Sequence, residues 1–200
     1  KSAPDGYTLI LSTVASHAIA VSLYPKLPYS ALADFEHIGM IDTLPNALLV
    51  GASFPARNLS ELIALAKAKP SALSFGSAGN GSSPHLAGEM FKAQAGIDAL
   101  HVPFKGGAPA LQALLGGEIS FMFESISTIN AHVKSGKLHV LGTTGAKRSP
   151  MLPNVPTLHE LGLTNFVAES WHGISAPAGT PGTIVARLNA ALRSAVETPS

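Results

Sequence analysis

The chain alternates short apolar segments with longer ones in which apolar residues recur three and four positions apart. Compact apolar segments such as residues 7–11 and 47–50 predict buried strands. Helical spacing, as at Leu111, Leu114 and Leu115, predicts amphipathic helices between the strands. Because strand and helix follow each other along the chain, the pattern predicts an α/β fold with mostly parallel strands.

Turn and cap residues place the ends of these elements. Asn58 with Glu61, and Thr157 with Glu160, have the spacing of capping boxes, which predicts that a helix begins at each pair. The predicted strands are residues 7–11, 35–41, 47–50, 99–102, 119–123, 138–141 and 166–176, with a further strand near residue 73.

A glycine-rich segment, residues 76–83, joins a predicted strand to a predicted helix. Its glycines allow a positive φ and a close approach of the backbone to a bound group. Ser83 is expected to cap the helix, with Pro84 in its first position. Free N–H groups and the helix dipole suit an anion, so a carboxylate cradle is one interpretation. A plain connecting turn is the other, since the spacing matches neither GxxxxGK(S/T) nor GxGxxG.

Composition narrows the classes of function. Of the 200 residues, 46% are hydrophobic and 12% are charged, which fits a compact protein with a sizeable core. A net charge of +1 gives no reason to expect nucleic acid or an anionic membrane as a partner. The lack of cysteine excludes disulfides and thiolate metal sites. The sequence contains no apolar run long enough to predict a transmembrane helix.

Eight histidines raise the question of a metal site, but their spacing argues against one. No HxH, HxxxH or HExxH pattern occurs, so we expect neither a metal nor a cofactor. His85, at the start of a predicted helix, is placed to support the glycine-rich segment. The histidines are His17, His37, His85, His101, His132, His139, His159 and His172.

Four small polar loops follow predicted strands. In α/β folds ligands bind at the carboxyl ends of strands, where the loops that lead into helices gather. The loops in such positions are residues 12–17, 76–83, 103–107 and 124–127. Their expected convergence favours a binding site over a set of plain connections.

Several motifs, in the same order, resemble those of one family of transport receptors. Residues 4–9 read PDGYTL, and residues 16–19 resemble that family's THAI. Residues 75–89 are similar to YGSAGNGTSQHLAGE, and residues 101–106 to HVPYKG. Further matches lie at residues 22–29, 147–150, 155–157 and 176–181. The chain is identified as a member of the Bug (TctC-like) family, the solute receptors of tripartite tricarboxylate transporters.

The resemblance implies a two-lobe, type II periplasmic-binding-protein-like α/β fold and no enzymatic activity. It implies a monomer in the periplasm that closes on a small carboxylate and hands it to membrane permease subunits. Lobe 1 is expected at residues 1–50 and 172–200, and lobe 2 at residues 51–171, with crossovers near residues 50–55 and 171–177. The family's N-terminal strand, its PFxxGGxxD-type loop and its C-terminal segment have no counterpart here, so we expect a fragment.

The resemblance also implies which residues contact the ligand. Thr13, Ser16 and His17 are expected to line the cleft from lobe 1. The second half of the carboxylate clamp, the neighbouring loop and the far end of the site are expected at Ser77, Ala78, Gly79, Asn80, Gly81, Ser82, Phe104, Lys105, Glu124 and Ser125. An acid such as Glu124, if it faces the cleft, favours a ligand with a donor or positive group and opposes a second carboxylate.

Two other functions use the same residues. A serine hydrolase would use Ser82 or Ser83 beside His85, but the sequence has no GxSxG elbow and no clear orienting acid, although Glu89 is near. A sensing subunit would present its liganded form to a signalling partner, and the residues do not separate that role from uptake. The identity of the carboxylate also stays open.

Overall fold

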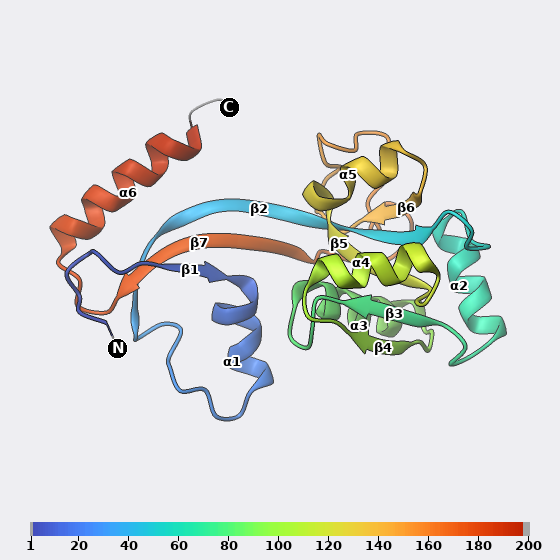
Figure 1. The fold of residues 1–200 in the computed structure, drawn as a ribbon, viewed down its shortest axis with the longest axis horizontal. Coiled ribbons are helices and arrows are strands. Elements are labelled where there is room, and N and C mark those ends of the chain that lie inside the picture. The colour runs from blue at the N-terminus through green and yellow to red at the C-terminus, as the bar shows by residue number, and fades with distance from the viewer. Residues whose placement is uncertain (1, 198–200) are drawn as a thin grey trace. The chain divides into compact units, whose positions relative to one another are not determined.

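A computed structural model describes residues 2–197 (Figure 1). Lys1 and residues 198–200, which the predicted lobe 1 includes, lie outside the described residues. The chain divides into two compact units: unit 1 is Lys1–Thr43 with Ser170–Ser200, and unit 2 is Leu44–Glu169. Both boundaries fall earlier in the chain than the predicted ones after Val50 and Trp171.

Unit 1 is built on a small antiparallel arrangement of strands. β1 (Ile10–Thr13) pairs antiparallel with β7 (Glu169–Pro177), and β7 lies between β1 and β2 (Phe35–Gly51). β1 runs into a π-helical turn (Ala15–Ile19) that continues as α1 (Ala20–Leu23). The predicted loop at residues 12–17 therefore contains the end of a strand and the start of a helix.

The last helix, α6 (Gly182–Glu197), also belongs to unit 1. Asn189 holds it to β2, because its side-chain amide donates to the Ile38 carbonyl at 2.6 Å. Leu192 lies against Gly39 of the same strand, where a methyl group would come within 2.9 Å of its Cδ2 atom. The helix therefore packs on β2 through one polar and one apolar side chain.

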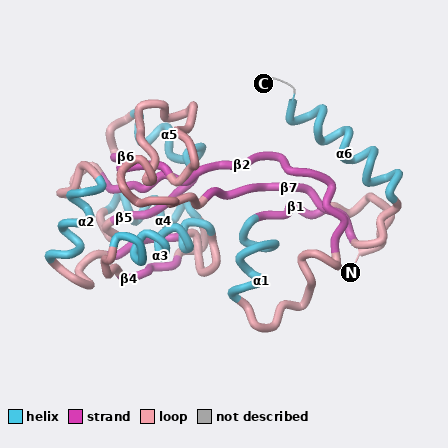
Figure 2. The backbone as a smooth tube through the Cα atoms, turned by 180° about the vertical axis from the view of Figure 1, so that it is seen from behind, coloured by secondary structure: helices cyan, strands magenta, loops and turns pink. Residues whose placement is uncertain are grey.

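β2 is one strand of 17 residues where the sequence predicted two, at residues 35–41 and 47–50 (Figure 2). The prediction was wrong because the polar residues between the two apolar runs looked like a break. In the structure, Asp42 is a half-buried strand residue whose Oδ1 lies 2.7 Å from Nδ1 of His172 on β7. Neighbouring strands at both ends of β2 keep its backbone extended through this polar stretch.

Unit 2 contains a mixed sheet. β3 (Ser74–Ser77) pairs parallel with both β4 (Leu100–Pro103) and β5 (Phe121–Ser125). The end of β2 pairs antiparallel with β5 and with β6 (Leu138–Thr143). The expectation of mostly parallel strands is therefore wrong for the chain as a whole, because an alternating order of elements does not fix the direction in which β2 enters this sheet.

Helices cover both faces of the unit 2 sheet. Leu48, Phe121 and Phe123 pack in one core cluster with α2 (Leu59–Ala68) and α3 (Ser83–Ala95). Leu49 and Met122 pack in a second cluster with α4 (Gly107–Gly116) and α5 (Ile126–Lys134). Alternate residues of β2 and β5 thus face opposite clusters, as the pleat of a strand requires.

Cap residues confirm some predicted helix ends and correct others. The Asn58 side chain accepts from the Glu61 N–H at 2.9 Å, as a capping box requires. α3 is capped by Ser82, which accepts from the His85 N–H, and not by the predicted Ser83. Gly96 ends α3 in the left-handed conformation, with φ 61°.

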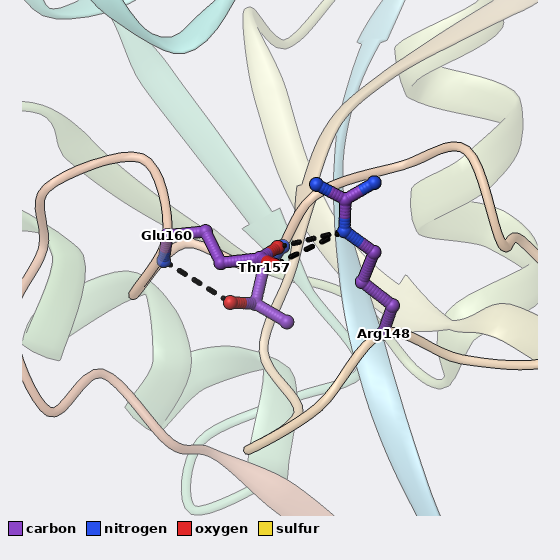
Figure 3. A network of polar contacts seen from close by, with 3 residues as sticks. All are labelled: Arg148, Thr157 and Glu160. Carbon is purple, nitrogen blue, oxygen red and sulfur yellow. Dashed lines mark hydrogen bonds and ion pairs between the residues drawn. The ribbon is translucent and has the colours of Figure 1, made fainter.

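The second predicted capping box forms its hydrogen bonds without a helix (Figure 3). The Glu160 N–H donates to Oγ1 of Thr157 at 3.1 Å, and the Thr157 N–H donates to the Glu160 carboxylate at 2.7 Å. Arg148 binds both oxygens of that carboxylate through Nε. The turn ends at once because Gly162 has φ 102°, outside the helical region.

Candidate functional site

The glycine-rich segment forms a tight loop between β3 and α3. We call residues 77–82 the clamp loop. Gly79 and Gly81 have φ 122° and 77°, which L side chains rarely adopt. The Gly79 N–H donates to Oγ of Ser77 at 3.1 Å, and the Ser82 hydroxyl donates to the Gly79 carbonyl at 2.7 Å. The serines of the motif therefore hold the loop in shape as well as offering polar atoms.

The loop still presents unused donors. Asn80 is exposed at its tip, and its side-chain amide has no hydrogen-bond partner among the described residues. The N–H of Gly81 is bound to Nδ1 of His85, at 3.2 Å. Because α3 begins directly after the loop, its positive dipole end adds to the potential there. The arrangement suits an anion in contact with Asn80 and the start of α3.

The side chains of two histidines contact the clamp loop and help to hold it in place. His85 and His101 stack with ring centroids 4.1 Å apart, and Nε2 of His101 lies 2.7 Å from Oγ of Ser77. Burial and the neighbouring His85 lower the pKa of His101, and Glu89 partly offsets them. The sequence predicted support from His85 but missed His101. The signal that would have found it is the pairing of β4 with β3, which places His101 beside Phe75.

The loop after β4 brings Phe104 to the clamp loop. The Phe104 N–H donates to the Ser77 carbonyl at 3.0 Å, and its ring packs beside Gly76. Lys105, the next residue, is exposed, and its side chain has no ion pair or hydrogen bond among residues 2–197. Phe104 is therefore a packing residue of this edge, and Lys105 is a free cation at its surface.

Glu124 and Ser125 end β5, beside the clamp loop. Glu124 is only 8% exposed, and its Oε1 accepts from the Ser125 N–H at 2.9 Å. Oε2 is buried and has no hydrogen-bond partner in the part of the chain described. Burial raises the pKa of this carboxyl, which the Ser125 N–H and the Thr128 hydroxyl partly offset. The register places Met122 opposite Gly76, so Glu124 and Ser77 lie at the same edge of the sheet.

The predicted residues of unit 1 form a separate group at the end of β1. Oγ of Ser16 lies 3.1 Å from Oγ1 of Thr13 and 2.9 Å from Nδ1 of His17. The His17 ring packs against Phe35 and His37, with centroids 4.9 and 5.8 Å away. Burial, together with His37, lowers the pKa of His17.

The other ring nitrogen of His17, Nε2, is buried without a hydrogen-bond partner among residues 2–197. His17 lines a pocket of about 350 Å³ within unit 1, together with Trp171. Ser175 joins the same pocket wall and binds both Ser12 and His37, at 2.5 and 3.0 Å. Trp171 is therefore a pocket residue.

The predicted ligand residues thus fall into two sets. Unit 2 brings together, at one sheet edge, the clamp loop with Phe104, Lys105, Glu124 and Ser125. Unit 1 brings together Thr13, Ser16 and His17. Each set is joined internally by hydrogen bonds or strand pairing.

The serines of the clamp loop do not have the geometry of a nucleophile. The Ser82 hydroxyl donates to a carbonyl and accepts from the His85 N–H, so it is not bonded to the His85 ring. Ser77 does contact an imidazole, that of His101, but it is fully buried. A nucleophilic serine needs both a general base and access to the substrate.

The described part of the chain shows neither a cluster of metal-binding side chains nor a membrane-spanning helix. No group of three or more histidine or acidic side chains between residues 2 and 197 is arranged to hold a metal ion. In the same residues, no helix combines the length and the apolar character that a membrane crossing requires.

The α/β fold, with two units and an anion-suited loop at the end of β3, is that of a periplasmic-binding-protein-like receptor. Residues 1–200 match the tripartite tricarboxylate transporter family receptor, TctC. The chain belongs to this family. Protein BugT of Bordetella pertussis is 36% identical over 198 residues, which are 98% of this chain and 61% of BugT.

Solved structures of the family have the same fold. MatC from Rhodopseudomonas palustris with bound malate is 36% identical with a TM-score of 0.89, covering 98% of this chain and 67% of MatC. R. palustris Rpa4515 with adipate is 33% identical with a TM-score of 0.94, covering 99% of this chain and 66% of that protein. The periplasmic binding protein BugD is 34% identical with a TM-score of 0.91, covering 100% of this chain and 66% of BugD. The chain thus spans about three fifths of BugT and two thirds of these structures.

Proposed function

We propose that this protein is a periplasmic solute-binding receptor that captures a small carboxylate and delivers it to the permease of a tripartite tricarboxylate transporter. The clamp loop carries the proposal. It is a glycine turn fixed by its own serines, and it leads directly into a helix. At its exposed tip, the Asn80 amide has no partner among residues 2–197.

The loop would recognise a carboxylate through polar atoms that are already fixed in position before the ligand binds. Fixing a loop before binding lowers the entropy that the ligand must overcome. The hydrogen bonds around Ser77 and Ser82 do this, and His85 and His101 hold the loop from the other side. A carboxylate placed at Asn80 would gain charge-assisted hydrogen bonds and the favourable dipole of α3.

The known ligands of relatives support the same class of compound. MatC was solved with malate and Rpa4515 with adipate, and both ligands are small carboxylates. Thr13, Ser16 and His17 are proposed to contribute from unit 1, because His17 offers a buried Nε2 that no described residue binds. Closure of the two units on the ligand would stabilise the closed state through contacts that the open state lacks.

The test is ligand binding to the full protein and to a clamp-loop variant. Isothermal titration with a panel of small carboxylates should find at least one that binds reversibly and is recovered unchanged. Gly79→Ala should weaken that binding, because the residue needs φ 122° and its new Cβ would lie 3.3 Å from the Phe104 carbonyl.

Gly136→Ala is the matched control. It also introduces a side chain at a positive φ, 71°, but nothing lies within 4 Å of its Cβ, and it follows α5 instead of the clamp loop. It should lower stability and leave affinity unchanged. Equal affinity of the parent and Gly79→Ala would remove the clamp loop from the site. A panel in which no carboxylate binds would contradict the proposed function itself.

A further inference from the structure

The carboxylate of Glu124 lies at the beginning of α4. On β5, Met122 packs in the cluster that contains α4, and Glu124, two residues later, points to the same face. A methyl group on Gly107, the first residue of α4, would collide with Oε2 of Glu124. The carboxylate therefore lies against the first turn of this helix, in a place that only a glycine leaves open.

In the part of the chain that the structure describes, no other side chain caps the start of α4. Gly106 occupies the capping position with φ 111° and no side chain, and no acidic residue lies in the first turn. A helix start carries a partial positive charge and unpaired N–H groups, which attract an anion. Glu124 is only 8% exposed, and its Oε2 atom has no hydrogen-bond partner among the described residues. The protein thus places its own carboxyl group at this helix start, whose positive dipole opposes the rise in pKa that burial causes.

The two helix starts at this edge therefore differ. α3 begins after a neutral loop with the exposed Asn80 amide, whereas α4 begins against a buried carboxylate. β3 leads into α3 and β4 leads into α4, and these two strands are parallel neighbours, so both helix starts lie at the same edge of the unit 2 sheet. Lys105 is exposed and forms no ion pair with Glu124, so no described cation neutralises this carboxylate.

We propose that the ligand has a single carboxylate, held at the clamp loop, and that Glu124 excludes ligands with a second carboxylate by occupying the start of α4. This inference rests on the proposed function. The rest of the ligand is uncharged or cationic, because a second anion at this edge would meet the field of a buried acid. Like charges repel strongly where little water separates them. The protein then differs in ligand class from MatC and Rpa4515, which were solved with dicarboxylates.

The experiment compares acids of equal chain length that differ only at the far end. The probes are butyrate, succinate and 4-aminobutyrate, and hexanoate, adipate and 6-aminohexanoate, titrated into the full protein at pH 7.5. The neutral-ended or amino-ended acid of at least one series should bind about ten-fold more tightly than its dicarboxylate, or better still. Tighter or equal binding of succinate and adipate would overturn the inference while leaving the proposed function standing. If none of these acids binds, both the inference and the proposed function are contradicted.

Glu124→Gln tests the residue itself. It keeps the shape of the side chain and removes the charge, so it should reduce the preference against succinate or adipate by about ten-fold. A preference that is unchanged in a folded Glu124→Gln protein would assign the selectivity to another residue and overturn the role of Glu124. Glu118→Gln is the matched control, since it removes an acid after the end of α4 and should leave the preference as it is. If Glu124→Gln does not fold, the comparison of acids on the parent still decides the ligand class.

Discussion

Gly88 in α3 allows this helix to lie close to β3, and its replacement by alanine should test how the clamp loop is held. A methyl group on Gly88 would overlap the ring of Phe75, with Cδ2 only 2.6 Å from the new carbon. Phe75 is fully buried and cannot turn away easily, because its ring stacks on His101 at 4.8 Å and on Phe121 at 5.7 Å. Gly88→Ala must therefore move the helix or the ring.

The expected cost follows from two opposing effects. Overpacking a well-filled core costs about 1–3 kcal/mol. Alanine in place of glycine inside a helix gains about 1 kcal/mol. The net destabilisation of Gly88→Ala is therefore about 0–2 kcal/mol, which for a protein of this size lowers Tm by up to roughly 8 °C. Since α3 directly follows the clamp loop, carboxylate affinity should fall as well.

Urea unfolding followed by circular dichroism measures the stability change, and titration calorimetry measures the affinity. Gly116→Ala is the control for helix propensity, because it lies in α4 and its Cβ would come no closer than 3.6 Å to Glu118. It should be as stable as the parent or slightly more so. The double variant Gly88→Ala with Phe75→Leu should recover part of the loss, because the smaller side chain removes the overlap.

The reasoning fails if Gly88→Ala unfolds at the same urea concentration as Gly116→Ala. It also fails if Phe75→Leu and Gly88→Ala are simply additive, because two residues in direct steric conflict must couple. Additivity would mean that α3 adjusts to the methyl group without strain.

Two further predictions concern stability. Asn58→Ala should lower the free energy of unfolding by about 1 kcal/mol in urea, because Asn58 caps α2 and its amide also binds the Glu61 carboxylate at 2.7 Å; an unchanged midpoint would show that the cap contributes nothing. The free energy of unfolding should fall as the pH drops below the usual imidazole pKa of about 6.5, because the pKa values of His17 and His101 are lowered in the folded state, which therefore binds fewer protons than the unfolded chain. His101→Gln should make this decline less steep between pH 8 and 5.

The sequence predicted the elements of unit 2 well, because their apolar runs are bounded by strong turn and cap signals. Asn58 is an example in which one side chain fixes a helix end. It failed for β2, since hydrophobic periodicity reports burial and the middle of that strand is only half-buried. It also failed for the direction of β2, because strand direction depends on pairing partners that lie far away in sequence.

The clamp loop could be predicted because its features are local. Glycines at positive φ and a helix start both lie within residues 77–83, although the helix is capped by Ser82 and not by the predicted Ser83. The role of His101 could not, because it depends on the register between β3 and β4. The burial of Glu124 against Gly107 was likewise hidden, since it requires that α4 start beside the end of β5. Contacts between strands decided both, and local patterns carry no register.

The packing of the core determines the position of the clamp loop, because two glycines on either side of the loop allow close contacts in the core. A methyl group on Gly76 would collide with Ile119, which packs with α4 on the face of the sheet opposite to α3. A methyl group on Gly88 would collide with Phe75, so α3 lies this close to β3 only with glycine at position 88. The loop between them is short, and its ends are set by that packing. Substitutions at the buried contacts of Gly76 or Gly88, which a ligand does not touch, should therefore change carboxylate affinity through the positions of Ser77 and Ser82. The proposed carboxylate site is therefore expected to respond to substitutions in this core that leave the residues of the clamp loop unchanged.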